Sequence, residues 1–125
     1  MDTILVVDDH PINRLLIQSM LSKDGWNVVE ADSAVAAMAL LEGGLRPAVI
    51  LMDIRMPVHD GFHATKQIRD WENINAIHQI PIIALTATTE EQAQIRATEV
   101  GMNGYIFKPV TLDQLRSALA TALLK

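Results

Sequence analysis

Five residues of this chain have side chains suited to binding a metal ion and a phosphoryl group, and each lies within two residues of the end of a short apolar run. In chain order they are Asp8, Asp9, Asp53, Thr86 and Lys108. Three carboxylates in one cleft would raise one another's pKa values unless a cation joined them. Oxygen ligands without His or Cys select Mg²⁺ or Mn²⁺ over zinc. A carboxylate nucleophile, a metal ion and a lysine ammonium are the parts that phosphoryl transfer needs.

The apolar runs themselves predict buried β-strands. Continuous apolar runs bounded by turn residues are typical of strands that are covered on both faces. The predicted strands are Ile4–Val7, Trp26–Glu30, Ala48–Met52, Ile80–Leu85 and Tyr105–Phe107. Helical patterns separate and follow them: Pro11 to about Asp24, Ala34–Leu41, Gly61 to about Trp71, Thr89 to about Gly101, and Thr111 to Leu124.

Local signals mark the ends of these helices. Pro11 suits the first helical position, and Gly25, Gly43-Gly44 and Gly101 are typical helix stops. Two segments, Thr89-Glu90-Glu91-Gln92 and Thr111-Leu112-Asp113-Gln114, have the pattern of a capping box. They predict the starts of the fourth and fifth helices.

Strict alternation of buried strands and helices predicts an α/β fold with a parallel sheet between two helical layers. With five strands, the doubly wound (βα)5 flavodoxin-like three-layer sandwich, strand order 2-1-3-4-5, is the leading choice. Ligands in such a sheet bind beyond the carboxyl ends of the strands, where strands 1 and 3 separate. The five polar residues all follow strands at that edge, so the topology should gather them. We expect residues 1–125 to form one domain with no output domain.

Composition narrows the classes of function. The chain has 125 residues, no cysteine and a net charge of −5. The lack of cysteine excludes thiol chemistry and a disulfide scaffold. With no signal peptide and no bilayer-spanning apolar run, it favours a cytoplasmic location without direct membrane contact. An acidic chain without a Lys/Arg cluster is the opposite of a nucleic-acid surface.

Each polar residue has an ordinary explanation when it is taken alone. Asp8 and Asp9 could cap a helix, and Asp53 could form a turn. Thr86 is a common residue type at a strand end, and a lysine such as Lys108 is most often a surface charge. Their joint placement at strand carboxyl ends favours a functional site.

At these residues the sequence resembles the receiver domains of two-component signalling, over the whole chain. The segments that carry the resemblance are Ile4–Asp9, Met52–Pro57 with Asp60-Gly61, Pro81–Ala87, and Gly101–Pro109. The resemblance implies a phosphoacceptor switch that takes a phosphoryl group from a phosphohistidine donor. Such a domain assists its own phosphotransfer and autodephosphorylation but has no separate substrate turnover.

The resemblance also implies roles for the acidic residues. Asp53 is the phosphoacceptor. Asp9 and Asp53 bind Mg²⁺ directly, Asp8 binds it through water, and the backbone carbonyl of Arg55 is a further ligand. Mn²⁺ is expected to substitute for Mg²⁺.

The remaining implied roles concern the switch. Thr86 and Lys108 bind the phosphoryl group, and Tyr105 rotates inward when Thr86 moves. The Lys108-Pro109 peptide is expected to be cis. The face formed by the fourth predicted helix, the Tyr105–Phe107 strand and the last helix would carry the signal to a downstream protein or a second copy.

Two segments resemble the receivers attached to hybrid histidine kinases, namely Pro11-Ile12-Asn13-Arg14 and Gly101–Pro109. Those receivers exchange phosphoryl groups with histidine phosphotransfer domains. The expected phosphodonor is therefore a histidine kinase or a histidine phosphotransfer domain.

The first predicted helix is apolar over a wider face than packing on a sheet requires. Its predicted core stripe comprises Leu16, Ile17, Met20 and Leu21. Ile12 and Leu15 lie off that stripe, near the acidic residues. A wide core face explains them as well as a binding surface does; the functional interpretation is a docking site for a phosphotransfer helix.

Other functions with similar parts fit less well. A phosphatase resembling the haloacid dehalogenase family needs a second Asp two residues after the nucleophile, where this chain has Arg55. A flavin binder needs a Ser/Thr/Gly-rich loop after the first strand, whereas Asp8-Asp9-His10-Pro11 would repel phosphate without a metal. An interaction module that is independent of phosphorylation would not need the intact set of acids. The four histidines, His10, His59, His63 and His78, lack the spacing of a metal site and are expected to be surface or turn residues.

Overall fold

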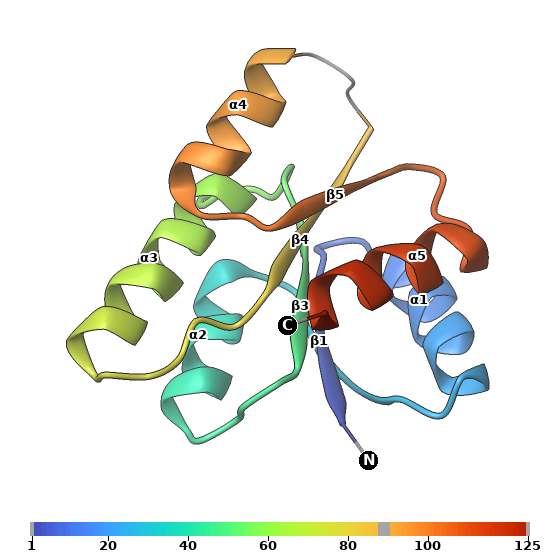
Figure 1. Cartoon of the computed structure of the whole chain (residues 1–125), viewed down its shortest axis with the longest axis horizontal. Coiled ribbons are helices and arrows are strands. Elements are labelled where there is room, and N and C mark those ends of the chain that lie inside the picture. The colour runs from blue at the N-terminus through green and yellow to red at the C-terminus, as the bar shows by residue number, and fades with distance from the viewer. Residues whose placement is uncertain (1, 88–90, 125) are drawn as a thin grey trace.

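The predicted five-stranded parallel sheet is present, in the predicted order. The computed structural model describes residues 2–87 and 91–124 (Figure 1). The strands are β1 (Thr3–Val7), β2 (Asn27–Ala31), β3 (Val49–Asp53), β4 (Ile82–Thr86) and β5 (Gly104–Phe107). They pair in the order β2-β1-β3-β4-β5, and every pairing is parallel. This is the doubly wound flavodoxin-like arrangement.

Helices cover both faces of the sheet. They are α1 (Pro11–Lys23), α2 (Ala34–Glu42), α3 (Gly61–Ile74), α4 (Glu91–Val100) and α5 (Leu112–Leu123). Figure 1 shows α1 and α5 together on one side and α2, α3 and α4 on the other. No helix in the described part of the chain is long and apolar enough to cross a membrane.

Side-chain alternation along the central strands builds the two cores. On β1, Ile4 and Val6 pack with Ile17 of α1 and Leu115 of α5. Their neighbours Leu5 and Val7 belong to the opposite core, which contains buried residues of α2, α3 and α4. Because successive side chains point to opposite faces, each central strand must be apolar throughout. The continuous apolar runs in the sequence are the result.

Several local signals act as predicted. Pro11 is the first residue of α1, and Gly25 after that helix has a positive φ of 88°. Thr111 and Gln114 form the predicted reciprocal capping box at the start of α5. The other predicted box, Thr89 to Gln92, begins in residues 88–90, which lie outside the described part of the chain.

Two predicted boundaries are wrong by several residues, and one buried network explains both. Helix α3 continues past Trp71 to Ile74, and β4 begins at Ile82 rather than Ile80. Glu72, fully buried, pairs with Arg69 at 2.8 Å. The Glu72 carboxylate also accepts the Ile80 N–H at 2.6 Å, and Arg69 donates to the Ile80 carbonyl at 2.8 Å. The N–H and carbonyl groups of Ile80 therefore bond to side chains of α3 and not to a neighbouring strand.

The same arginine anchors the turn before β5. Arg69 donates to the Gly101 carbonyl at 3.1 and 2.8 Å and to Asn103 Oδ1 at 2.9 Å. Asn103 Oδ1 also accepts the Ile82 N–H at 2.9 Å. Removing one partner of a buried ion pair lowers the free energy of unfolding by about 3–5 kcal/mol. The network of Arg69 is therefore strong enough to fix the edge of the sheet opposite the five polar residues.

The predicted core stripe of α1 is too wide by one residue. Ile17 and Leu21 are buried, and Met20 packs at the edge of the core. Leu16, however, is 53% exposed. A flat sheet contacts only a narrow stripe of a helix, and Leu16 lies outside it.

Candidate functional site

The three predicted carboxylates meet at the carboxyl edge of the sheet. Asp8 and Asp9 follow β1, and Asp53 is the last residue of β3. The register pairs Val7 with Met52, which brings the residues that follow them together. One carboxylate oxygen from each of the three lies within 4.8 Å of the other two. Among the described residues this is the group of acidic and histidine side chains that could hold a metal ion.

Backbone contacts fix the first acid. The Asp8 N–H donates to the Ala31 carbonyl at 3.1 Å, which extends the pairing of β1 with β2. The Asp8 carboxylate accepts the His10 N–H at 2.9 Å, directly before α1. Asp8 is completely buried. The start of the helix thus orients the carboxylate that precedes it.

The loop after β3 is held just as closely. The Gly61 N–H donates to the Ile54 carbonyl at 2.8 Å. A Cβ atom on Gly61 would lie 2.4 Å from the Asp53 carbonyl oxygen, so only glycine allows this approach. The Arg55 N–H lies 3.3 Å from Asp53 Oδ1. The loop therefore folds back onto the residue that carries the central carboxylate.

Lys108 supplies the positive charge of the site. Its Nζ lies 3.1 Å from Asp53 Oδ1 and 3.7 Å from Asp8 Oδ2. The Lys108 N–H donates to the Thr86 carbonyl at 2.8 Å. The Lys108-Pro109 peptide is cis, as expected. The lysine side chain is largely buried, and its ammonium group lies next to two of the three acids.

Burial raises the pKa of Asp53 to about 6, and the charge of Asp8 adds to the rise. Lys108 lowers the same pKa but does not cancel the increase. A single ammonium is therefore too little positive charge for this cluster.

The cluster has unused acceptors suited to a hard cation. Asp8 Oδ2, Asp9 Oδ1 and Asp53 Oδ2 are buried and accept no hydrogen bond within the described structure. Buried polar atoms are nearly always paired, so these oxygens indicate a missing partner. Oxygen ligands from carboxylates match Mg²⁺. The residues present thus fit a magnesium ion.

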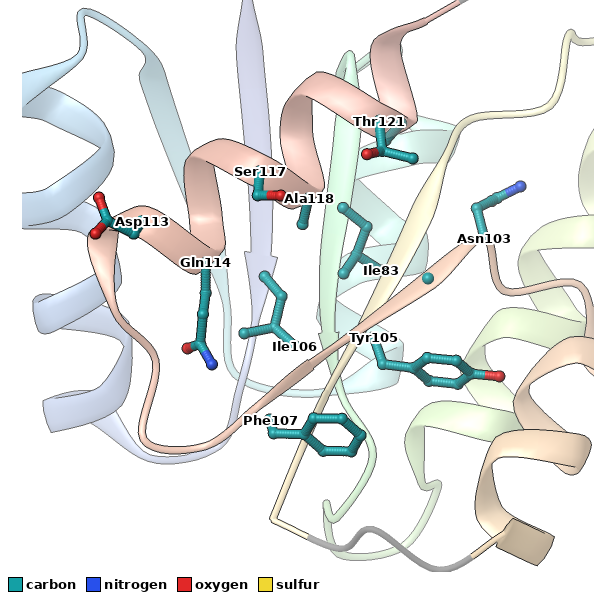
Figure 2. A pocket seen from close by; sticks show the side chains of 12 residues that line it. Ile83, Asn103, Tyr105, Ile106, Phe107, Asp113, Gln114, Ser117, Ala118 and Thr121 are labelled. Carbon is teal, nitrogen blue, oxygen red and sulfur yellow. The ribbon is translucent and has the colours of Figure 1, made fainter.

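Thr86 and Tyr105 lie on neighbouring strands beside the acids. Thr86 ends β4 and is buried. The Tyr105 hydroxyl donates to the Gln94 carbonyl of α4 at 2.7 Å and lies 3.1 Å from Thr98 Oγ1. Figure 2 shows the ring pointing away from α5. In this structure Tyr105 is thus held against α4 and does not point inward.

The groove in Figure 2 lies away from the acids, along the edge strand β5 and helix α5. Its volume is about 490 Å³. Ile106 and Ala118 contribute apolar surface, and Asp113, Gln114 and Ser117 contribute polar groups. The groove belongs to the predicted signalling face and holds none of the five polar residues.

Ile12 and Leu15 lie on the surface near the acids. They are 71% and 61% exposed. Leu16, the misplaced residue of the predicted stripe, extends this apolar surface toward Lys108 and Pro109, with which it lines a hollow of about 110 Å³. Of the two explanations left open by the sequence, the wide core face does not apply to Ile12 and Leu15, because both are exposed.

Sequence reasoning missed two arrangements near the site. The Arg14 side chain donates to the backbone carbonyl of Asp8, a contact that no residue pattern predicts. His59 and His63 stack, with ring centroids 4.2 Å apart, on the loop after β3 and the first turn of α3. Their i, i+4 spacing was visible, but the first of the pair lies before the helix begins.

Comparison with known proteins identifies the family. Residues 4–120 match the family model of the response regulator receiver domain. This chain belongs to the receiver domain family. It is therefore a signalling domain of the two-component type, with the receiver's function of phosphoacceptor switch, and its family is not a family of classical enzymes.

Sensor histidine kinases are among the curated proteins similar to this chain. The chain is 37% identical over 117 residues to the sensor histidine kinase RcsC of Salmonella typhi, and 36% identical over 113 residues to GacS of Pseudomonas protegens. The matches cover 94% and 90% of this chain, but only 12% of each kinase.

Solved receivers share the fold closely. The receiver domain of sensor histidine kinase PA1611 from Pseudomonas aeruginosa is 36% identical, with a TM-score of 0.85 over 98% of this chain and 97% of that one. That structure has a magnesium ion coordinated in its active site cleft. Chemotaxis protein CheY4 of Vibrio cholerae has a TM-score of 0.90 at 29% identity, over 98% of this chain and 99% of that one.

Replacing Asp9 with Ala should weaken Mg²⁺ binding by roughly tenfold or more. Even the mutation of a residue that only supports a metal ligand lowers metal affinity by that factor. Mg²⁺ titration in the absence of a phosphodonor, followed by the amide shifts of Asp8, Asp9 and Asp53, measures the affinity. Asp113→Ala, an exposed residue in the first turn of α5, removes the same charge elsewhere and should change little. Equal affinities in both variants would contradict the metal geometry.

Proposed function

We propose that this domain takes a phosphoryl group onto Asp53 from the phosphohistidine of a histidine kinase or a histidine phosphotransfer domain. The observation that supports the proposal is that the carboxylates of Asp8, Asp9 and Asp53 lie together. Lys108 Nζ lies 3.1 Å from Oδ1 of the last of them. A carboxylate nucleophile beside a fixed cation suits a reaction in which positioning and charge stabilisation dominate.

In the transfer, an Asp53 carboxylate oxygen forms a bond to phosphorus while the bond from phosphorus to the donor imidazole nitrogen breaks. The electron pair of that bond stays on the nitrogen, and the donor ring, which carries a proton on its other nitrogen, leaves as neutral imidazole. Lys108 pairs with a phosphoryl oxygen, and the Thr86 hydroxyl donates to another. These contacts hold the phosphoryl group in line with Asp53.

Asp9 and Asp53 would hold Mg²⁺ directly, Asp8 through water, and the Arg55 carbonyl would complete the protein ligands. The bound ion, with Mn²⁺ as an expected substitute, supplies positive charge that offsets the phosphoryl oxygens. The same arrangement would assist hydrolysis of the aspartyl phosphate, in which water attacks phosphorus and Asp53 leaves as a carboxylate.

Asp53 is expected to be the only phosphorylation site. Incubation with acetyl phosphate and Mg²⁺ should add one phosphoryl mass to the parent and none to Asp53→Asn, as measured by intact mass. Asp113→Asn, which removes one exposed carboxylate, should be labelled like the parent. A phosphoryl mass on Asp53→Asn would show that the acceptor is another residue.

The exposed apolar residues of α1 support a docking role. Ile12 and Leu15 lie at the helix end next to the acids, so a helix packed on them would approach Asp53. We infer that the phosphotransfer partner contacts these two residues. We also infer that this contact takes place in the cytoplasm. Their large exposed fractions mean that they add little to the free energy of folding.

Replacing Ile12 and Leu15 together with Ser should therefore slow phosphotransfer from a protein donor by about tenfold, which corresponds to about 1.4 kcal/mol lost over the two contacts. Labelling by acetyl phosphate and the melting temperature should stay near parent values. Val35→Ser with Ile74→Ser, two exposed residues of α2 and α3, is the matched control. A large drop in melting temperature, or unchanged transfer from the protein donor, would contradict the docking role.

The proposed switch runs from Asp53 through Thr86 to α4. A phosphoryl group brings up to about two negative charges and strong acceptor oxygens. Thr86 would move its hydroxyl toward them, and Tyr105 would leave the Gln94 carbonyl and turn inward. Differential contacts of the phosphoryl group with Thr86 and Lys108 shift the population. The altered face of α4, β5 and α5 would then bind a downstream protein or a second copy.

Thr86→Ala should leave Asp53 phosphorylation largely intact and weaken this coupling. Amide shifts across α4 and at Tyr105, with and without beryllofluoride as a phosphoryl mimic, measure it. Thr86→Ser keeps the hydroxyl and should retain most of the shift. If Thr86→Ala responds like the parent, the coupling runs through Lys108 or the metal.

A further inference from the structure

Arg14 joins three elements beside the acids. It lies in the first turns of α1, and its Nη1 donates to the Asp8 carbonyl oxygen at 2.7 Å. Its Nε donates to Glu30 Oε1 of β2 at 3.1 Å. The side chain is only 19% exposed. It thus ties α1 and β2 to the end of β1.

The carbonyl that Arg14 binds belongs to the peptide between Asp8 and Asp9. A strong hydrogen bond to this oxygen prevents rotation of that peptide plane. Rotation would swing the Asp9 backbone and aim its carboxylate elsewhere. Asp8 has other restraints, from Ala31 and from the His10 N–H. Within the described part of the chain no hydrogen bond holds the Asp9 side chain, and its nearest basic group, His10 Nε2, lies 4.0 Å from Asp9 Oδ1. The orientation of Asp9 therefore depends on the peptide that precedes it.

Glu30 makes the contact stiffer. A guanidinium is a planar fork, so fixing Nε on Glu30 also fixes the direction in which Nη1 points. Glu30 lies across from Val6 in the pairing of β1 with β2. The fork is therefore aligned by the sheet itself.

We propose that Arg14 is a positioning residue for the divalent cation: it orients the Asp8–Asp9 peptide so that the Asp9 carboxylate can bind the same ion as Asp53. This inference rests on the proposed magnesium-dependent phosphorylation of Asp53.

The sign of the effect separates positioning from simple electrostatics. A cation near the acids repels Mg²⁺, so if Arg14 acted only through its charge, its removal would tighten Mg²⁺ binding. If Arg14 positions Asp9, its removal weakens binding. The two explanations predict opposite changes in the dissociation constant.

The test uses three variants and one control. Arg14→Met removes both hydrogen bonds, Arg14→Lys keeps the charge without the fork, and Glu30→Gln keeps an acceptor without its charge. Arg116→Met is the control, because it removes the same charge from the Arg116–Asp24 pair between α5 and the end of α1. Mg²⁺ dissociation constants come from amide shifts of Asp8, Asp9 and Asp53 without phosphodonor, and melting temperatures are measured without Mg²⁺.

We expect Arg14→Met to weaken Mg²⁺ binding by roughly tenfold, as for other residues that orient metal ligands. Arg14→Lys should weaken it less, Glu30→Gln by a small factor, and Arg116→Met not at all. The loss in Arg14→Lys at constant charge, with a melting temperature near that of Arg116→Met, would identify positioning.

Unchanged or tighter Mg²⁺ binding in Arg14→Met and Arg14→Lys would overturn the inference while leaving the metal site intact. Slower transfer from a protein donor with unchanged Mg²⁺ affinity would also overturn it and make Arg14 a partner contact. Failure of the proposed function looks different, because the parent protein itself would then not bind Mg²⁺ at its acids.

Discussion

The repulsion among three carboxylates that lie close together at one edge of the sheet is the constraint on which the rest of this structure depends. Asp8 and Asp53 are buried and Asp9 lies beside them, and one lysine reaches two of the three. Despite that lysine, the pKa of Asp53 is raised to about 6, well above its usual value. A protein keeps such a cluster only if the surrounding structure holds it together. The arrangement is therefore poised to gain from a cation and from chemistry that uses one.

The surrounding structure holds the cluster with backbone contacts. The sheet register fixes where β1 and β3 end, the His10 N–H holds Asp8, and the close approach of Gly61 folds the next loop onto Asp53. At the opposite edge, the Arg69–Glu72 pair fixes the starts of β4 and β5. The binding edge thus gathers the charged groups, while the far edge is fixed by a buried ion pair.

The topology and the placement of the acids were predictable because both follow from patterns with strong physical causes. Strands that are covered on both faces must be apolar, so the run Ile4–Val7 marks a strand and Asp8 marks its end. Contacts that depend on side-chain geometry were not predictable. Leu16 was placed in the core because periodicity says nothing of how narrow a stripe the sheet contacts. The start of β4 was misplaced because Ile80 looks like a strand residue until Glu72 is seen to bind its backbone. The reach of Arg14 to the Asp8 carbonyl likewise depends on three elements that meet only in the fold.

Lys108 lies between the surface proposed for donor binding and the strand end proposed for the switch. Its side chain contacts Asp53 and Asp8, and its backbone N–H binds the carbonyl of Thr86. With Pro109 it also lines the hollow beside Leu16 on α1, so its backbone lies between the apolar surface proposed for the donor and the strand end proposed for the switch. A partner helix on α1 would therefore press against the segment that carries the lysine, while a phosphoryl group on Asp53 would draw the same lysine from the other side. The edge strand β5 is held at its start by the contact of Arg69 with Asn103 and at its end by the Lys108 N–H on the Thr86 carbonyl. In the proposed function, donor binding and switching would then both act on the segment that carries Lys108, and this shared segment would be enough to couple them.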